Sequence, residues 1–206
     1  MAPELNAPRG LPGATVVEVG GKRAYEREGE LWLSTSTVLS LSPWGHLAHI
    51  PPAALEWGAT RGTYVHNACE LSDQGLLDFA GLDDRLKGYV LGWNMVRHLL
   101  RDAHTEALRV QEACNTFGWA DRTGTWGSGG DDAPAVVDIK TSKYPSARHA
   151  LQIASYAMPG EIGVIVYLKP KGPPNIVIYN DLPLWYARFS ALACEAHTWV
   201  EEERGK

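Results

Sequence analysis

The residues best suited to chemistry lie in two segments with the composition of β-strands, 116–124 and 135–141. The second contains the run AVVDIKT, in which Asp138 and Lys140 are two residues apart and so point to the same face of an extended strand. A carboxylate in that position can hold a hard divalent cation, and an ammonium can orient an attacking water or bind a phosphate oxygen. An ordinary ion pair at a sheet edge is the alternative interpretation.

A second carboxylate, Asp121, lies on the strand just before, in the run FGWADRTG. Neighbouring strands of a hairpin lie about 5 Å apart, so Asp121 and Asp138 can reach one metal ion. Two carboxylates held together without a cation repel each other and raise one pKa, which a metal ion would resolve. The alternative role for Asp121 is that of a turn or capping residue.

Two helical segments add polar side chains at a spacing of four. Gly62, His66 and Glu70 share one face of the first helix, and Gln152 and Tyr156 share one face of the second. A histidine or a polar pair at this spacing is common on ordinary helices. These residues gain weight only from their order along the chain with the two acidic strands.

In that order the patterns GxxxHxxxE, GxxD, DIKTS and QxxxY resemble the RecB-like exonuclease branch of the PD-(D/E)XK nuclease superfamily, over residues 62–156, nearly half of the chain. The run LWLSTSTVLS also resembles the N-terminal region of bacteriophage members. The resemblance implies a restriction-endonuclease-like core and a DNA nuclease dependent on one or two Mg²⁺ or Mn²⁺ ions. We expect it to be an exonuclease of DNA recombination, repair or phage DNA processing.

The resemblance also implies roles for individual residues. Asp121, Asp138 and Lys140 become the catalytic residues. The metal ligands become the side chains of His66, Asp121 and Asp138 and the backbone carbonyl of Ile139. Supporting roles at the site or on the DNA strand fall to Glu70, Glu112, Gln152 and Tyr156.

Cations that flank these motifs are expected to contact DNA, namely Arg61, Lys143 and Arg148, together with His149. Trp119 and Trp126, beside the acidic strand, are candidates for base stacking. The net charge of −5 argues against a protein that coats nucleic acid by charge alone, but an enzyme can carry local basic contacts.

The three cysteines, Cys69, Cys114 and Cys194, are widely spaced and form no CxxC pair. The iron–sulfur members of the superfamily carry four cysteines, three of them clustered near the C-terminus. Only Cys194 lies in that region of this chain, so we expect no iron–sulfur cluster. The three are expected to be small buried hydrophobic residues.

The chain has 206 residues, with a hydrophobic fraction of 45%, which suits one globular domain. Residues 1–13 are rich in Pro, Gly and Ala and are expected to form a flexible arm before a single domain over 14–206. No apolar run approaches the roughly 20 residues of a membrane helix, and no signal-peptide core is visible. We therefore expect no membrane partner and a cytoplasmic location in a bacterial cell, with phage origin open.

Hydrophobic periodicity and turn residues predict an α/β (α+β) fold, with a mixed central β-sheet flanked by helices. Strands are predicted at 15–19, 22–26, 31–39, 107–114, 116–124, 135–141, 162–168 and 175–179. Helices are predicted from 52 to about 75, with a break at Gly58 or Gly62 left open, then at 82–100 and 146–157 and at the C-terminus.

Two other functions stay open from the sequence. One is a non-catalytic nucleic-acid-binding or recombination-accessory module on the same fold, and the other is an unrelated metal hydrolase that contains Asp-x-Lys. A homo-oligomer and a recombination or helicase partner are both compatible with the sequence. The strand form and polarity of the DNA substrate are not determined by it.

Overall fold

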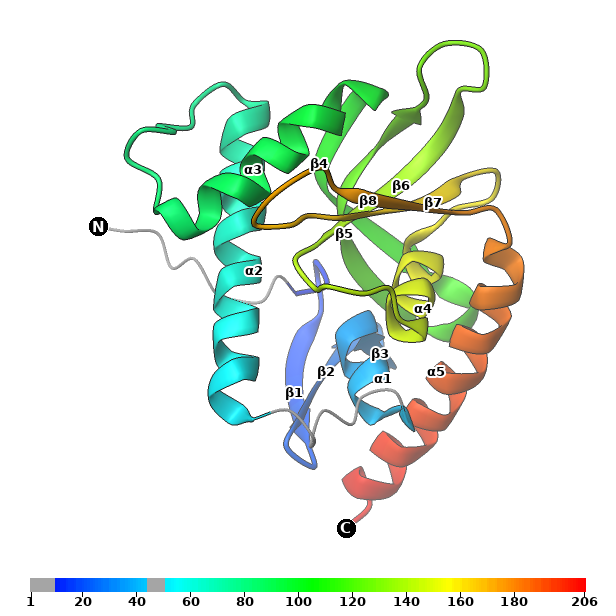
Figure 1. Ribbon diagram of the computed structural model, residues 1–206. Helices are drawn as coiled ribbons and strands as arrows, with labels where there is room; N and C mark the ends of the chain where they lie inside the picture. Colours follow the sequence, from blue (N-terminus) through cyan, green and yellow to red (C-terminus); the bar gives the residue numbers. More distant parts are fainter. Residues whose placement is uncertain (1–9, 44–50) are drawn as a thin grey trace.

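The computed structural model describes residues 10–43 and 51–206. A mixed β-sheet runs through the middle of the molecule, with helices on both faces (Figure 1). The strands are β1 (Thr15–Val19), β2 (Lys22–Arg27), β3 (Glu30–Ser34), β4 (Leu100–Gln111), β5 (Thr116–Trp126), β6 (Ala133–Lys140), β7 (Ile162–Tyr167) and β8 (Asn175–Tyr179). The helices are α1 (Thr35–Leu41), α2 (Pro52–Asp73), α3 (Asp84–Val96), α4 (Ala147–Tyr156) and α5 (Leu182–Arg204). This arrangement confirms the predicted α+β class.

Strand β5 is the branch point of the sheet. The described strands follow the order β1-β2-β3-β5-β6-β7-β8, and β4 pairs with β5 outside this path. Because β4 lies along almost the whole of β5, strands β3 and β6 must share the other edge of β5. β3 pairs with residues 116–117 and β6 with residues 122–126. Residues 118–121 therefore lie where the two neighbours part.

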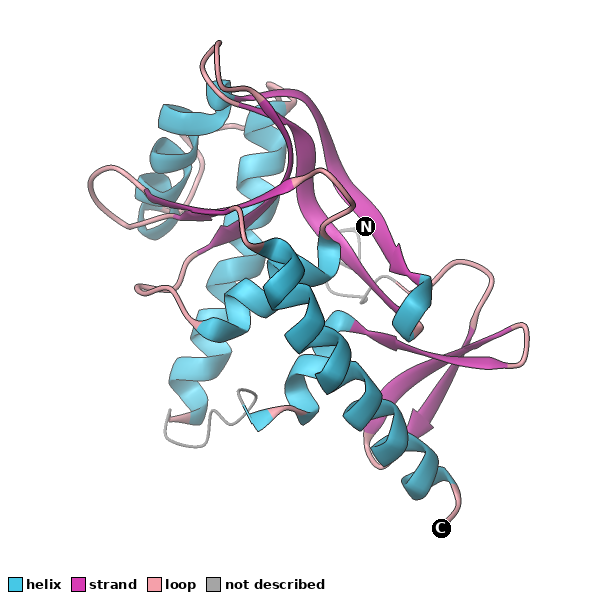
Figure 2. Cartoon of the chain, turned by 90° about the vertical axis from the view of Figure 1, so that its right-hand side faces the viewer, coloured by secondary structure: helices cyan, strands magenta, loops and turns pink. Residues whose placement is uncertain are grey.

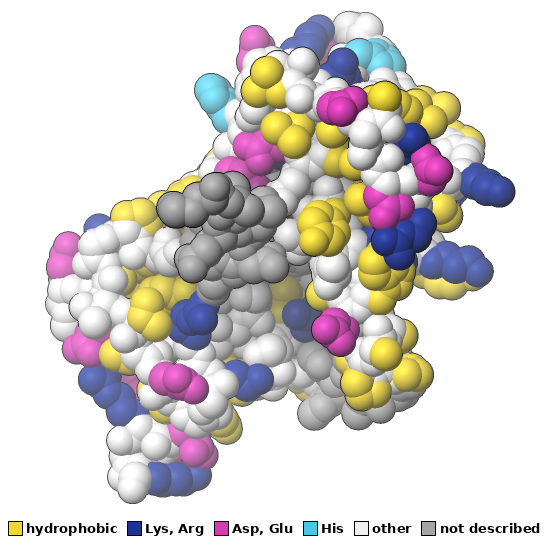
Figure 3. All heavy atoms as spheres, turned by 90° about the vertical axis from the view of Figure 1, so that its left-hand side faces the viewer, with side chains coloured by type: hydrophobic (Ala, Val, Ile, Leu, Met, Phe, Trp, Pro, Cys, Tyr) yellow, Lys and Arg dark blue, Asp and Glu magenta, His cyan; other side chains and the backbone are white. Residues whose placement is uncertain are grey.

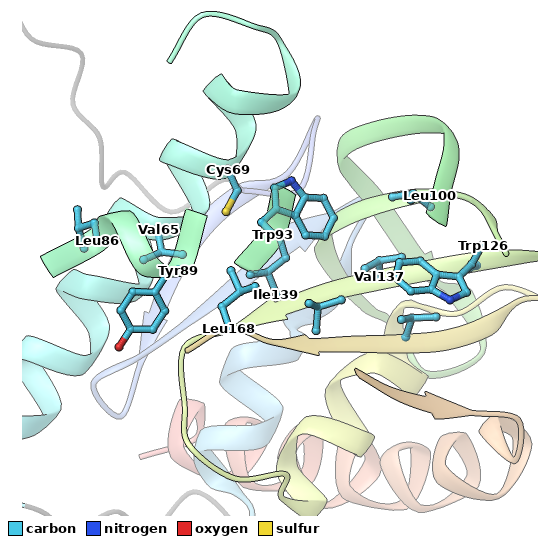
Figure 4. Close-up of a cluster of buried hydrophobic side chains, with 13 residues drawn as sticks. Val65, Cys69, Leu86, Tyr89, Trp93, Leu100, Trp126, Val137, Ile139 and Leu168 are labelled. Atoms are coloured by element: carbon cyan, nitrogen blue, oxygen red, sulfur yellow. The ribbon is translucent and has the colours of Figure 1, made fainter. Parts of the chain in front are cut away.

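The hydrophobic core has a layer on each face of β6. Val137 and Ile139 are fully buried against α2 and α3, beside Val65 and Trp93 (Figure 4). Val136 packs on the opposite face, in a cluster that includes α4 and the start of α5. The near-continuous apolar sequence of β6 is what a strand covered on both faces requires. Its two polar residues, Asp138 and Lys140, stand out against this background.

Helix α5 ties the two ends of the sheet together. It runs from the end of β8 to the β1–β2 hairpin on the α4 side of the molecule (Figure 2). Gly20 in that hairpin has a φ of 54° and lies so close to α5 that an added Cβ would meet the Trp199 ring at 2.6 Å. The left-handed backbone and the close approach both favour glycine here.

The predicted strand over residues 31–39 is wrong in its second half. β3 ends at Ser34, whose Oγ accepts a hydrogen bond from the Thr37 backbone N–H at 3.1 Å and caps α1. Serine and threonine satisfy the free N–H groups of a helix start, and this local bond outweighs the β preference of the threonines. The helix from residue 52 is unbroken, so neither Gly58 nor Gly62 interrupts it.

Residues 1–9 of the expected N-terminal arm lie outside the described part of the chain. Leu11, near the end of that arm, is buried in a cluster with Tyr25, Trp32 and Phe117. The packed domain therefore begins before residue 14. None of the helices within 10–43 and 51–206 is long and apolar enough to cross a membrane.

The three cysteines are free thiols in different surroundings. Cys69 is buried as expected, but Cys114 is only partly buried and Cys194 is exposed. Cys194 lies on the outer face of α5, so the expectation that it is buried is wrong.

Candidate active site

The two acidic strands bring Asp121 and Asp138 together where β5 leaves β6. The last backbone pair of this ladder is Arg122 with Val137, so Asp121 and Asp138 occupy the next opposed position. The Asp121 side chain takes over from the ladder there, since its Oδ2 accepts a hydrogen bond from the Ile139 backbone N–H at 2.6 Å. Both carboxylates therefore lie where β5 and β6 separate. The Asp121 carboxylate accepts the hydrogen bond that a backbone carbonyl of β5 would accept if the ladder continued.

Lys140 lies on the same face of β6 as Asp138 and forms an ion pair with it. Its Nζ is 2.5 Å from Asp138 Oδ2, and Asp138 is only 3% exposed. That oxygen nevertheless has no well-aligned hydrogen bond in the described structure. A buried carboxylate oxygen held only by charge is costly, and it is available to a further cation.

His66 reaches the acidic pair from α2. Its Nδ1 lies 3.0 Å from Asp121 Oδ1, and 28% of its side chain is exposed. The exposed part borders a cavity of about 280 Å³ that is also lined by Gly62, Thr63, Asn67 and Glu106. The buried acidic pair therefore has one neighbour that solvent can reach.

The pKa values of the two carboxyl groups shift in opposite directions. Burial raises the pKa of Asp138 above its ordinary value, and the charge of Asp121 adds to this, although Lys140 and His66 act against it. Burial also acts to raise the pKa of Asp121, but the charge and hydrogen bond of His66 outweigh it, with help from Lys140 and the Ile139 N–H, and lower the pKa overall. The same contact raises the pKa of His66 against the effect of its own burial. The site therefore has one carboxylate whose ionised form is favoured by its neighbours and one whose ionised form is disfavoured by burial.

Helix α4 closes the site through Gln152 and Tyr156. Gln152 Nε2 donates a hydrogen bond to Tyr156 Oη at 3.0 Å, and Tyr156 is buried. Burial raises the pKa of Tyr156, and the charges of Asp138 and Asp121 raise it further, so the phenol stays protonated. The spacing of four in the sequence thus produces a bonded pair that faces the acids.

Gly118 provides the space for Tyr156. An added Cβ at Gly118 would lie 2.2 Å from the Tyr156 ring and 2.9 Å from Thr35 Oγ1. Gly118 and Asp121 are the two fixed positions of the GxxD pattern. Gly118 therefore leaves room for the Tyr156 ring, and Asp121 of the same pattern faces that tyrosine.

A further acid at the site, Glu106, is not predicted by the sequence patterns. The β4–β5 ladder pairs Thr105 with Arg122 and Ala107 with Ala120, so Glu106 stands opposite Asp121. Its φ of 51° is left-handed, a strained conformation for a residue with a side chain. It lines the same cavity as His66. Counting the register back from the β4–β5 turn would have placed it beside Asp121, but the sequence shows no motif there.

Of the two acids predicted to support the site, Glu112 lies far from it and Glu70 lies near His66 on α2. Glu112 begins the short 3₁₀ turn after β4 and is exposed, six residues or about 20 Å along the strand from Glu106. The prediction of a supporting role rests on its being an acid on the preceding strand, but the antiparallel register places Glu112 at the end of β4 that is far from Asp121. Glu70 lies one helical turn beyond His66 and is hydrogen-bonded to Gln74 Nε2 at 3.4 Å.

The expected DNA-contacting residues divide into two groups. Arg148 is half-buried and donates to the Leu39 carbonyl at 2.7 Å, so it serves the fold. His149 is also half-buried, and burial with the nearby cations Lys140 and Arg148 lowers its pKa to about 4, which leaves it neutral. Lys143 is exposed, and Arg61 is half-buried and donates to the Thr141 carbonyl at 3.2 Å; both line a groove beside the site.

The tryptophans suggested for base stacking are not both available. Trp126 is 5% exposed and belongs to the hydrophobic cluster beneath α2 and α3. Only Trp119 remains partly exposed.

As the side chains stand, no three His, Cys, Asp or Glu residues within 10–43 and 51–206 are arranged to hold a metal ion. The donors nevertheless suit a hard divalent cation, because two carboxylates and a histidine converge and Asp138 Oδ2 lacks an aligned partner. Asp121, Asp138 and His66 are the residues that would hold it.

Comparison with known proteins adds little. No family model matches this chain, and no curated protein matches it. Among solved structures, the crystal structure of a protein named SSO0001 matches at 20% sequence identity over 69% of this chain and 71% of that chain, with a TM-score of 0.35. A likeness at this level identifies neither a family nor a function.

Proposed function

We propose that this protein is a Mg²⁺- or Mn²⁺-dependent deoxyribonuclease of the PD-(D/E)XK superfamily, in its RecB-like exonuclease branch, without an iron–sulfur cluster. The observation that supports this best is the buried group of Asp121, Asp138 and Lys140 at the parting of β5 and β6, with His66 bound to Asp121. Three separate sequence patterns contribute to this one group. In this proposal the mixed sheet is a restriction-endonuclease-like core.

The chemistry proposed is hydrolysis of a phosphodiester bond. When bound, the metal ion would polarise the scissile phosphate and lower the pKa of a water molecule. Asp121 and Asp138 would hold the cation through their carboxylates, with His66 and the Ile139 carbonyl as further ligands. Lys140, released from Asp138, orients the attacking water or offsets the charge that develops on the phosphate.

Gln152 and Tyr156 have a supporting role in this proposal. Their mutual hydrogen bond fixes the phenol over Gly118, where it faces the two carboxylates. Groups that orient metal ligands in this way are typically worth about 10–100-fold in metal affinity or activity. We further propose that the enzyme acts in DNA recombination, repair or phage DNA processing in the bacterial cytoplasm, alone or with a recombination or helicase partner.

A non-catalytic nucleic-acid-binding or recombination-accessory module is the second candidate. It is favoured by the closed ion pair of Lys140 with Asp138, which occupies the carboxylate a metal ion would need. Such a module would bind DNA equally with and without divalent ions. An active nuclease requires them.

The proposal is tested by incubation of the full chain with linear, nicked and closed-circular DNA, labelled separately at the 5′ and 3′ ends, with Mg²⁺, Mn²⁺ or EDTA. We expect release of labelled nucleotides from linear DNA with either metal ion and none in EDTA. Closed-circular DNA should persist. Intact linear DNA under all conditions would leave the binding module as the better account, and cutting of closed circles would contradict the exonuclease assignment.

A further inference from the structure

A groove of about 720 Å³ lies beside the candidate active site, at the end of β6. It is bordered by α2, α3, the loop after β6 and the loop between β7 and β8. The Leu168 backbone N–H donates to the Lys140 carbonyl at 2.8 Å, so the groove begins at the residue that carries the candidate catalytic ammonium. Its volume lies in the range of roughly 300–1,000 Å³ that is usual for ligand sites.

The groove is positively charged although the protein is not. Its lining includes Arg61, Lys143, Lys169 and Lys171, and the described lining residues include no Asp or Glu. The net charge of the whole chain is −5, so these cations are concentrated against the average. On the face seen from α2 and α3, basic, acidic and apolar side chains are otherwise interspersed (Figure 3). The groove therefore suits a ligand with several negative charges.

The lining is also apolar and aromatic. Tyr144 is 67% exposed on the loop after β6, where a large ring gains little from its own fold. Pro145 and Pro170, on either side of the groove, add exposed apolar surface, and Tyr89 is held under the Arg61 guanidinium, 5.7 Å from its ring. Cations around an apolar surface with an exposed ring match alternating phosphates and bases.

The wall that carries Lys169 and Lys171 is held in place by α3. An added Cβ at Gly88 would lie 1.8 Å from the Pro170 carbonyl oxygen, so the loop backbone rests directly on the bare helix backbone. Gly92, one turn later, faces Leu168 and Pro174 in ordinary contact. The two lysines thus project from a preformed wall, and binding need not order it first.

We infer that this groove binds an unpaired DNA strand beside the active site, with its phosphates on the four cations and a base stacked on Tyr144. A duplex does not fit this chemistry, because its bases are stacked within the helix and offer no face to a tyrosine. The inference rests on the proposed nuclease function for its direction, since the bound strand continues toward Lys140. It names the single-stranded form of the substrate, which the function alone does not specify.

The test is fluorescence anisotropy of a short fluorescein-labelled oligothymidine and of a blunt hairpin duplex, with the full-length protein in EDTA so that no cleavage occurs. The variants are Lys169→Gln/Lys171→Gln and Tyr144→Ala. The matched control is Lys22→Gln/Arg23→Gln, which removes two positive charges from the β1–β2 hairpin, away from the groove. Circular dichroism verifies that all variants are folded.

We expect the wild type to bind the single strand more tightly than the hairpin. Loss of two phosphate contacts should lower the slope of log affinity against log salt by about 1.4, at about 0.7 per contact for a single strand. Tyr144→Ala should weaken single-strand binding about tenfold, within the usual range for base stacking. The control variant should bind like the wild type.

Wild-type affinity in both groove variants, or equal binding of the hairpin, would overturn the inference. The same proteins are then assayed for cleavage with Mn²⁺. Tight single-strand binding without any cleavage would support the groove and contradict the nuclease proposal. Cleavage together with unchanged affinity in the groove variants would support the nuclease proposal and contradict the role of the groove.

Discussion

Two buried ionic clusters lie on opposite faces of β5, and they are carried by consecutive residues. Arg122 points toward α2 and α3, where its Nε donates to Asp73 Oδ2 at 3.0 Å, and Trp93 Nε1 donates to Asp73 Oδ1 at 2.7 Å. Asp121 points the other way, toward Asp138 and the end of α4. The first cluster has one carboxylate, Asp73, with two cations near it, Arg122 and Arg97, and the Trp93 N–H group as a donor. The second has two carboxylates, with His66 and Lys140 shared between them.

This difference indicates that the Asp73 cluster stabilises the fold, whereas the Asp121–Asp138 cluster is suited to binding a cation or transferring a proton. The single Asp73 carboxylate therefore has positive charge in excess around it. Around Asp138, two carboxylates share Lys140 and His66, and burial raises the pKa of Asp138 while the neighbouring Asp121 is kept ionised. Opposite shifts in a pair of titratable groups are typical of sites that bind metal ions or transfer protons.

The largest effect is expected at Lys140 and Asp138. Lys140→Ala should lower the rate of DNA cleavage with Mn²⁺ by about 10²–10³-fold or more, because one preorganised positive group is lost, and Asp138→Asn should do at least as much through the metal ion. Initial rates on end-labelled linear DNA measure both. Asp132→Asn, which removes an exposed carboxylate paired with Arg101, is the matched control and should cut normally. A wild-type rate in folded Lys140→Ala would contradict the role assigned to this lysine.

The Asp73 cluster should respond in stability. Asp73→Ala leaves the Arg122 guanidinium, 2% exposed, without its carboxylate, and should lower the free energy of unfolding by about 3–5 kcal/mol. Asp138→Asn should instead leave the metal-free protein as stable as the wild type or more so, because it removes a carboxylate whose ionisation burial disfavours. Urea unfolding measures both. Equal losses in the two variants would remove the distinction between the clusters.

Gly118 and Gly62, the glycines of the two motifs, should differ in how their substitution by alanine changes stability and activity. Gly118→Ala forces a Cβ into the Tyr156 ring and should cost about 1–3 kcal/mol of stability, together with activity. Gly62→Ala meets only Thr141 Oγ1 at 3.9 Å and should be neutral or stabilising by about 0.5–1 kcal/mol, since glycine is unfavourable within a helix. Thermal unfolding in EDTA and the cleavage assay provide the readouts. A destabilised Gly62→Ala would show that this glycine has a packing role not visible in the structure.

The smallest effect is expected in the pH dependence of the metal-free protein. The pKa of His66 is raised in the fold, so its pairing with Asp121 stabilises below the ordinary histidine pKa and is lost as pH rises through the raised value. The pKa of Asp121 is lowered, so its contribution is present above the ordinary carboxyl pKa and is lost as pH falls through the lowered value. His66→Gln should abolish the loss at the alkaline side. NMR titration of the ring protons checks the premise, and a His66 pKa at or below its ordinary value would contradict it.

Much of the site could be predicted because it depends on local periodicity. A hairpin and the alternation of a strand suffice to bring Asp121, Asp138 and Lys140 to one face, and a spacing of four suffices for Gln152 and Tyr156. The contact of Tyr156 with Gly118 depends on how α4 packs on the sheet, which no local pattern encodes. Arg148 looks like a surface cation in sequence but turns inward to cap the Leu39 carbonyl.

Other features were inaccessible because they depend on long-range register. Glu106 lies just outside the predicted strand 107–114, whereas β4 begins at Leu100 and its register with β5 places Glu106 opposite Asp121. Its left-handed backbone breaks the β pattern that would have drawn attention to it. The basic groove combines four separate elements, among them a loop between β7 and β8 that the sequence does not connect with β6. Its position becomes clear only when α3 is seen to support that loop at Gly88.

The central claim is that the Asp121–Asp138 cluster holds a divalent cation, and Mn²⁺ binding followed by electron paramagnetic resonance tests it most directly. Wild type, Asp138→Asn and the control Asp132→Asn are titrated with Mn²⁺ in the absence of DNA. We predict that the wild type and Asp132→Asn remove free Mn²⁺ from solution alike, and that Asp138→Asn binds it at least tenfold more weakly. Equal binding by Asp138→Asn, or no binding by the wild type at millimolar Mn²⁺, would contradict the account.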